Sequence, residues 1–220
     1  MNTLVYDLET LNARQPSDAA DRLPGISYAD CSRDEYWKRH DLVGISVICA
    51  YASWLDRYFA FSDHVPCEAA HVLDIEPLSG FRELVGGAQL FVNFNGGAAS
   101  HLGFDNVVLR ANEMALPQRA YYDLLVEGWI AQGLNPLIYD PSTHGGGLGD
   151  YARENLGMDK SLDGESAPVA WQLGKYHQVW SYCMLDVRLT WKLFKLSQKL
   201  GHLHNPITDR LVKFRQIDEH

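Results

Sequence analysis

Three apolar segments near the N-terminus constrain the fold more than any other feature of the sequence. They lie at residues 3–9, 42–52 and 57–61, and each is rich in the apolar, β-branched or aromatic residues of strands. A turn is expected between the second and the third, near Trp54–Asp56. A fourth strand pattern at residues 88–95 follows a helical pattern. Three strands in a row, then helices alternating with a further strand, predict an α/β fold. We expect a mixed β-sheet of about five strands, the first three antiparallel, flanked by α-helices.

The rest of the chain is predicted to form helices and two long connections within a single domain over residues 1–220. Helical patterns cover residues 77–87, 103–115, 122–133, 148–157 and most of 169–200. Residues 12–40 are polar and too long for a bare connection, which indicates an insertion with a short helix near Ser32–His40. Residues 133–150 include a stretch rich in proline and glycine and are expected to form a flexible loop.

Composition and charge limit the classes of function. No apolar run approaches the roughly 18 residues of a membrane-spanning helix, and the N-terminus lacks a signal-peptide pattern. We therefore expect a soluble, cytoplasmic protein with no membrane partner. The four cysteines form no C-x-x-C pair, so neither a zinc site nor a disulfide framework is expected. A net charge of -9 argues against a broad basic face for duplex DNA. A nucleic-acid enzyme remains possible, because bound divalent cations neutralise phosphate locally.

Two acidic side chains interrupt the first strand, in the stretch LVYDLET. Successive side chains of a strand alternate between its faces, so Asp7 and Glu9 share one face, about 7 Å apart at the backbone. Carboxylates at that spacing can converge on one hard cation, which prefers oxygen ligands. Solvated acids at the end of an amphipathic strand are the alternative interpretation of this pair.

Asp186 in the last predicted helix constrains the interpretation more strongly. On a helical wheel it falls in the middle of an arc whose other members are Val179, Tyr182, Cys183, Leu189, Thr190, Leu193, Phe194 and Leu200. Arg188, Lys192, Lys195 and Lys199 fall on the opposite side, which we interpret as a solvated face. A carboxylate on an apolar face is costly unless it is paired or bound to metal. A buried salt bridge, or a helix cap reached from another element, is the alternative.

Two further residues are grouped with these acids. Tyr182 lies one helical turn before Asp186 on the same face, so their side chains are neighbours. Asp105, in the stretch HLGFDNVVL, falls in the first turn of its predicted helix. An acid at that position also stabilises the helix dipole, and this role alone is the alternative explanation of Asp105.

The three acidic stretches together resemble the motifs of the DEDD superfamily of 3′–5′ exonucleases, which have a ribonuclease-H-like fold. YDLET, GFDNVVL and YCMLDV stand in the order and approximate spacing of that superfamily's motifs, from about residue 2 to about residue 197. The pattern Y-x-x-x-D is similar to the tyrosine (DEDDy) branch, which includes polymerase proofreading domains and ribonuclease D. The histidine branch has H-x-x-x-x-D, and Ser181 occupies that histidine position here.

The resemblance implies a hydrolase that cleaves phosphodiester bonds at the 3′ end of single-stranded nucleic acid and releases nucleoside 5′-monophosphates. Asp7, Glu9, Asp105 and Asp186 would hold two Mg²⁺ or Mn²⁺ ions about 4 Å apart. Tyr182 would orient the attacking water or help to deprotonate it. DNA is the favoured substrate.

The same resemblance implies substrate contacts next to the metal ligands. Thr10 and Leu11 would contact the terminal nucleotide, and Phe104 would line the site. One departure concerns the asparagine that the family has a few residues before F-D. His101 stands at the N-x-x-F-D position, and Asn95 is ten residues before the aspartate. Either His101 takes over this role, or a short insertion displaces Asn95; the metal ligands are unaffected.

Three other functions remain open at this level. An exoribonuclease that trims RNA would share these motifs, because sugar discrimination depends on contacts around the 2′ position. A non-catalytic nucleic-acid-binding domain that kept the fold is supported only by His101. A non-nuclease α/β domain would use the acids as caps and surface charges, with Asp7 and Asp186 more than about 10 Å apart. His144 is expected on a solvent-exposed loop.

Overall fold

The computed structural model describes residues 1–13, 24–29, 40–96, 104–137, 143–160, 164 and 166–217. Its strands are β1 (Thr3–Thr10), β2 (Ile45–Ala52), β3 (Arg57–Phe61), β4 (Ile75–Glu76), β5 (Leu90–Asn93), β6 (Ala120–Asp123), β7 (His202–Asn205) and β8 (Arg210–Lys213). Its α-helices are α1 (Cys67–Leu73), α2 (Leu78–Gly87), α3 (Phe104–Ala111), α4 (Leu124–Ala131), α5 (Leu148–Leu156), α6 (Ala167–Gln172) and α7 (Tyr176–Leu200), and a 3₁₀ turn, η3, covers His40–Leu42.

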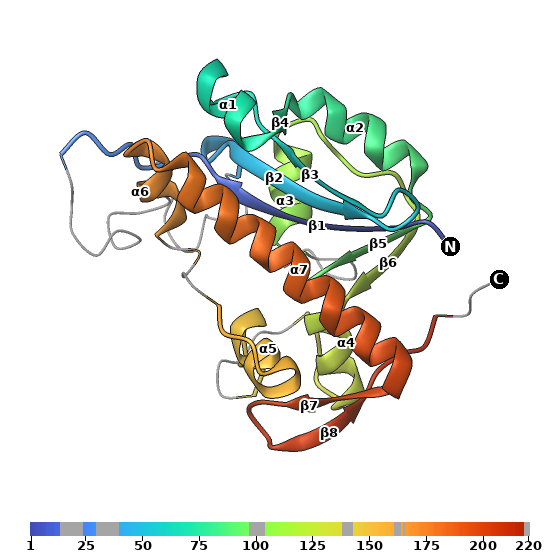
Figure 1. Ribbon diagram of the computed structural model, residues 1–220. Helices are drawn as coiled ribbons and strands as arrows, with labels where there is room; N and C mark the ends of the chain where they lie inside the picture. Colours follow the sequence, from blue (N-terminus) through green and yellow to red (C-terminus); the bar gives the residue numbers. More distant parts are fainter. Residues whose placement is uncertain are drawn as a thin grey trace.

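A six-stranded mixed sheet forms the centre of the molecule, in the order β4-β3-β2-β1-β5-β6 (Figure 1). The pairs β1–β2 and β2–β3 are antiparallel, while β3–β4, β1–β5 and β5–β6 are parallel. The predicted α/β class and the antiparallel first three strands are therefore confirmed. The sheet has six strands rather than about five, because the two-residue strand β4 extends its edge.

Several short elements differ from the sequence prediction. Strand β6 was not expected, because AYYD is too short to show a period, and the predicted helix at 122–133 begins only at Leu124. The hairpin β7–β8 was also not expected. The predicted loop at 133–150 ends before Leu148, where α5 begins. Leu200, expected on the buried arc, is 49% exposed, because it ends α7 next to a left-handed Gly201.

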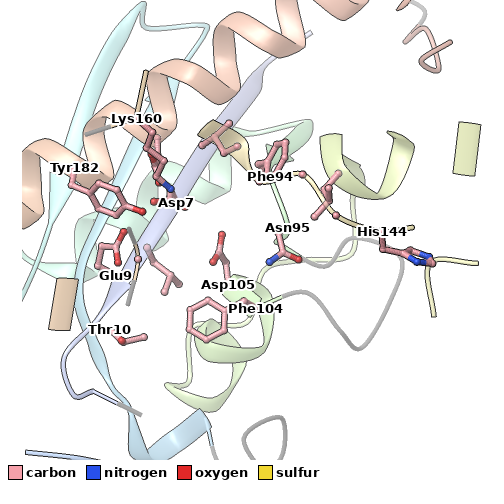
Figure 2. Close-up of a pocket in the computed structure, with 18 of the residues that line it drawn as sticks. Asp7, Glu9, Thr10, Phe94, Asn95, Phe104, Asp105, His144, Lys160 and Tyr182 are labelled. Carbon is pink, nitrogen blue, oxygen red and sulfur yellow. The ribbon is translucent and has the colours of Figure 1, made fainter. Parts of the chain in front are cut away.

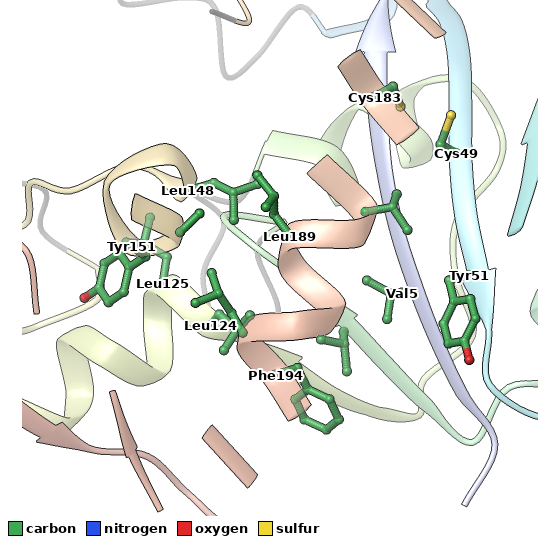
Figure 3. Close-up of a cluster of buried hydrophobic side chains, with 14 of the residues drawn as sticks. Val5, Cys49, Tyr51, Leu124, Leu125, Leu148, Tyr151, Cys183, Leu189 and Phe194 are labelled. Atoms are coloured by element: carbon green, nitrogen blue, oxygen red, sulfur yellow. The ribbon is translucent and has the colours of Figure 1, made fainter. Parts of the chain in front are cut away.

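Strand β1 divides the apolar interior into two cores, because its alternate side chains enter opposite sides of the sheet. Leu4, Tyr6 and Leu8 pack with residues of α2 and α3. Val5 packs with residues of α4, α5 and α7 (Figure 3). Every residue of β2 is buried, which agrees with its nearly continuous apolar sequence. Helices therefore cover both faces of the sheet, with α7 crossing the face opposite α2 and α3 (Figure 1).

Little of the predicted insertion at 12–40 lies within the described residues. The Ala29 amide donates to the Ala13 carbonyl at 2.7 Å, which joins two described pieces of it. The helix expected near Ser32–His40 lies outside the described residues except at His40, which begins η3. In the part of the chain that the structure describes, none of the helices has the length and apolar character needed to cross a membrane.

Asp123 joins the end of the sheet to the start of α4. Its Oδ1 accepts hydrogen bonds from the amides of Leu125 and Val126, at 3.0 and 3.2 Å, so it is the N-cap of α4. The same oxygen accepts from the Asn95 amide at 3.0 Å. One carboxylate thus fixes both the helix start and the segment that follows β5.

We expect Asp123→Ala to lower the free energy of unfolding by about 2 kcal/mol, the upper end for losing an N-cap, because a third amide also loses its acceptor. Asp123→Asn keeps an acceptor oxygen and should lose less than half of that. Urea unfolding followed by circular dichroism measures both. Equal losses in the two variants would contradict the capping role.

Candidate functional site

Strand β1 brings Asp7 and Glu9 to the centre of the sheet. Asp7 is paired with Cys49 of β2 and Glu9 with Val47, so the backbone carrying both acids is held by antiparallel hydrogen bonds. The register shifts between Glu9 and Thr10, where the strand ends its regular pairing. Both acids point to the side of Val5, the face that α7 covers. A central strand therefore presents two carboxylates beneath a helix.

Helix α7 brings Asp186 and Tyr182 onto those acids. Both residues are buried, with 4% and 2% of their surfaces exposed. The Cys183 thiol donates to the Asp7 carbonyl oxygen at 3.4 Å, which ties α7 to β1 beside the acids. Asp186 thus occupies the middle of the buried face of α7, as the helical wheel predicted.

Helix α3 brings Asp105, which is 5% exposed in its first turn. The amide of Phe104 donates to the Asn95 carbonyl at 3.0 Å, so the helix start is tied to the segment after β5. Behind it, Asn93 Nδ2 donates to the Tyr6 hydroxyl at 2.8 Å, and that hydroxyl donates to Asn106 Oδ1 at 2.6 Å. This chain of hydrogen bonds connects β5, β1 and α3, and fixes where Asp105 points.

One cavity of about 570 Å³ collects these side chains (Figure 2). The predicted site residues that line it are Asp7, Glu9, Thr10, Phe104, Asp105, Tyr182 and Asp186. Asn95 lines it too, with a left-handed backbone at φ 66°. Leu11 is not part of the lining; it is half-buried, and its amide donates to the Gly44 carbonyl. His101 lies outside the described residues.

Two residues that line the cavity, His144 and Lys160, were not predicted to lie there. His144, expected on a solvent-exposed loop, is 6% exposed, with its ring edge-on to Trp129 at 4.9 Å and Nε2 3.1 Å from the Asn135 carbonyl. For Lys160 the sequence predicts no role. Its Nζ lies 2.6 Å from Asp186 Oδ2 and 4.6 Å from the centre of the Tyr182 ring. The stretch GMDKSLDG has no periodicity that could have placed this lysine.

The crowded acids shift one another's protonation. Burial, and next the charge of Asp186, raise the pKa of Asp7 from 3.8 to about 8. Burial and then Asp7 likewise raise the pKa values of Glu9 and Asp105. The pKa of Asp186 is raised by burial, although Lys160 opposes the shift. Without bound cations, the cluster therefore keeps protons that isolated carboxylates lose.

The donor set fits divalent cations. Asp7 Oδ2, Asp105 Oδ2 and Asp186 Oδ1 are buried and lack a hydrogen-bond partner among the described residues. Buried carboxylate oxygens without donors are costly, and hard cations such as Mg²⁺ and Mn²⁺ coordinate such oxygens. Oxygens of Asp7 and Glu9 and the Cys183 sulfur lie within 4.8 Å of one another, close enough to share one ion. Asp7, Glu9, Asp105 and Asp186 all line one cavity rather than being dispersed as separate caps and surface charges.

Comparisons with known proteins show the fold. No protein-family model matches the chain, and no curated protein sequence matches it. Among solved structures, it is similar to the family B DNA polymerase from the hyperthermophilic archaeon Pyrobaculum calidifontis, with a TM-score of 0.51 and 15% identity. The similarity covers 91% of this chain and 24% of that chain. The mixed sheet and its flanking helices form a ribonuclease-H-like fold.

The raised pKa of Asp7 predicts how stability depends on pH. Between about pH 4 and pH 8 the folded protein holds this proton more tightly than the unfolded chain, so metal-free stability falls as pH rises. Asp7→Asn removes the charge, and at pH 8 in EDTA we expect its Tm to exceed that of the wild type by at least about 2–4 °C. At pH 5 the difference should shrink.

Thermal unfolding at both pH values measures this effect, with Glu83→Gln, an exposed acid of α2, as the control. The control should leave the wild-type pH dependence unchanged. Added Mn²⁺ should raise the Tm of the wild type more than that of Asp7→Asn. A variant destabilised equally at both pH values would show that Asp7 is a structural residue instead.

When no metal is bound, Lys160 is expected to neutralise part of the negative charge of the acids. Replacing it by methionine leaves Asp186 without its ion-pair partner. We expect the metal-free protein to lose about 2–3 kcal/mol, somewhat less than for a fully buried pair, because the lysine side chain is 23% exposed. Saturating Mn²⁺ should reduce this loss, since the bound cation neutralises the same carboxylates.

Chemical unfolding with and without Mn²⁺ tests the role of Lys160. Arg153→Gln is a matched control, because it breaks an ion pair with Asp159 of 2.9 Å whose side chains are 64% and 79% exposed. The control should lose far less stability than Lys160→Met under both conditions, because water screens an exposed ion pair. If Lys160→Met loses the same free energy of unfolding with and without Mn²⁺, Lys160 does not neutralise the acids in the absence of metal.

Proposed function

We propose that the protein is a metal-dependent 3′–5′ exonuclease that removes nucleoside 5′-monophosphates from the 3′ ends of single-stranded nucleic acid. The observation that carries the proposal is the meeting of Asp7, Glu9, Asp105 and Asp186 with Tyr182 at one cavity. These residues come from three segments far apart in the chain. A ribonuclease-H-like fold and a similar solved structure that is a DNA polymerase also support action on nucleic acid.

The four acids would hold Mg²⁺ or Mn²⁺, most directly through the unpartnered oxygens of Asp7, Asp105 and Asp186. Bound there, such ions lower the pKa of a water and stabilise charge on the departing 3′ oxygen. The protein's own part is to hold four mutually repelling carboxylates in place. It does so with a central strand and two packed helices rather than with loops.

Tyr182 would orient the attacking water by donating a hydrogen bond. Burial, and then the charge of Glu9, raise the pKa of its phenol far above the ordinary value of 10. The phenol therefore stays protonated at neutral pH, which favours a donor over a general base. Asp186 lies one turn later on α7, and its negative charge adds to the rise in the pKa of this phenol. The Lys160 ammonium, 4.6 Å from the centre of the Tyr182 ring, helps to hold the ring in place.

The terminal nucleotide would occupy the part of the cavity beyond the acids. Thr10 and Phe104 lie next to the carboxylates, and Asn95 and Phe94 continue the lining (Figure 2). The position of Asn95 in the cavity lining supports a contact between this residue and the substrate. We propose DNA as the first substrate to test. An exoribonuclease is the second candidate, since a hydroxyl such as that of Thr10 could meet a 2′-hydroxyl.

The proposal predicts release of mononucleotide from a 3′-labelled single-stranded oligonucleotide in Mn²⁺ or Mg²⁺, and none in EDTA. Asp7→Ala and Asp186→Ala should lower kcat/KM about 10³-fold or more, because each removes a ligand used in the transition state. Tyr182→Phe should lower kcat roughly 10–100-fold with little change in KM. Parallel DNA and RNA substrates identify the sugar preference.

Glu83→Gln, remote from the cavity, should match the wild type in this assay. Calorimetry with Mn²⁺ accompanies it, since binding without hydrolysis would indicate the non-catalytic nucleic-acid-binding alternative. Wild-type protein that releases no mononucleotide, or alanine variants as active as the wild type, would refute the exonuclease proposal.

A further inference from the structure

Helix α7 carries a row of positive charge on the face opposite Asp186. Arg188, Lys192, Lys195 and Lys199 are all exposed, and they follow one another at intervals of four, three and four residues. Side chains at such intervals lie along one line of a helix, about 5–6 Å apart at their Cβ atoms. Asp186 is the helix's one carboxylate, and it is buried on the other face. These four residues are called here the α7 cation row.

Among the described residues, no carboxylate forms an ion pair with the α7 cation row. Within the described part of the chain, the lysines and arginines that form ion pairs are Arg57, Arg153, Lys160 and Arg215. Like charges three or four residues apart repel one another and weaken a helix. The whole chain has a net charge of -9, so this concentration of uncompensated positive charge is a local exception. Such a row complements a linear polyanion.

Two aromatic rings accompany the row. The Arg188 guanidinium lies 5.2 Å from the centre of the Tyr58 ring, and the Lys195 ammonium lies 5.5 Å from that of Trp191. Both rings are partly exposed, and both pack on the buried Tyr51, at 4.7 and 5.0 Å between ring centres. Aromatic rings beside cations are the combination that binds single strands with little sequence preference. The row therefore offers contacts to bases as well as to phosphates.

The α7 cation row faces away from Asp186, and one contact links it to the segment that carries Lys160 at the cavity. Lys192 Nζ lies 3.3 Å from Met158 Sδ, and Lys160, two residues after Met158, lines the cavity and pairs with Asp186. Arg188 follows Asp186 on the same helix by two residues. From there the row runs along α7 across the sheet, towards the helix end at β7 (Figure 1). A strand whose 3′ end lies in the cavity would meet the row as it leaves.

We propose that the α7 cation row is the track that binds the phosphodiester backbone of single-stranded substrate on the 5′ side of the nucleotide in the cavity. This inference rests on the proposed exonuclease function and names the surface that would hold the rest of the substrate. Binding there is electrostatic and depends on length rather than sequence. The row has no acidic neighbour on its own helix face, so it remains attractive although the protein as a whole is acidic.

The test measures binding of fluorescent single-stranded DNA by anisotropy, at several salt concentrations. The full chain carries Asp7→Asn throughout, which prevents digestion. The triple variant Lys192→Gln, Lys195→Gln, Lys199→Gln is compared with a control, Arg82→Gln, Lys175→Gln, Lys213→Gln, that removes the same charge from exposed positions elsewhere. The two DNAs have about 12 and about 3 nucleotides, since sites of this kind cover roughly 4–16 nucleotides.

For the longer DNA we expect the row variant to bind at least tenfold more weakly than the control variant. In the row variant, the slope of log Kd against log salt should be about 2 lower than in the control variant. The three lost phosphate contacts each contribute roughly 0.7 to this slope. For the trinucleotide the two variants should agree within about twofold. Equal binding of the longer DNA by both variants would overturn the track, and so would equal weakening for both lengths. Poly-glutamate competing as well as unlabelled DNA of the same length would overturn it too.

The binding test of the track and the hydrolysis test of the exonuclease proposal can give different answers. Wild-type hydrolysis together with a row variant that binds like the control would refute the track and leave the nuclease standing. No hydrolysis by the wild type, together with weakened binding by the row variant, would refute the nuclease and leave a single-strand binding surface.

Discussion

The mutual repulsion of buried carboxylates near the end of β1 is the constraint that the surrounding scaffold has to withstand. Asp7, Glu9, Asp105 and Asp186 share one cavity, and each is at least partly withdrawn from water. Among the described residues, Lys160 is the cation within ion-pair distance of them. Burial is the largest cause of the raised pKa values of all four acids, and the charges of neighbouring carboxylates raise those of Asp7, Glu9 and Asp105 further.

The scaffold holds these groups together because its supports lie outside the cavity. Strand β1 is hydrogen-bonded on both sides, to β2 and to β5. Helix α7 is fixed by a long apolar face whose residues, such as Leu189 and Phe194, pack between the sheet and α4 and α5 (Figure 3). The start of α3 is held through Tyr6 and Asn106. Strain at the site is thus tolerated because well-packed elements, rather than the acids themselves, supply the stability.

The sequence predicted the elements that have a clear period. Strand β1 was identified by alternation, β2, β3 and β5 by runs of apolar, β-branched or aromatic residues, and α7 by a helical arc. Asp186 was the most informative residue, because a carboxylate amid an apolar arc requires a specific partner. The short strands β6 and β4 were missed because, unlike β5, neither lies in a longer apolar run, and so few residues show no period. Lys160 and His144 could not be placed, because they belong to connections whose course is set by tertiary contacts.

Under the proposed function, the two faces of α7 would let an acidic protein act on a polyanion. Its core face directs a carboxylate into a cavity where divalent cations would reverse the local sign of charge. Its outer face carries four cations within twelve residues of one another, Arg188 to Lys199. An acidic surface elsewhere repels nucleic acid at long range, and at physiological salt this repulsion is screened beyond about 8 Å. If the proposed track binds substrate, attraction confined to one helix would select a strand that runs along it, and the helix that carries Asp186 would also determine which part of the polymer reaches the cavity.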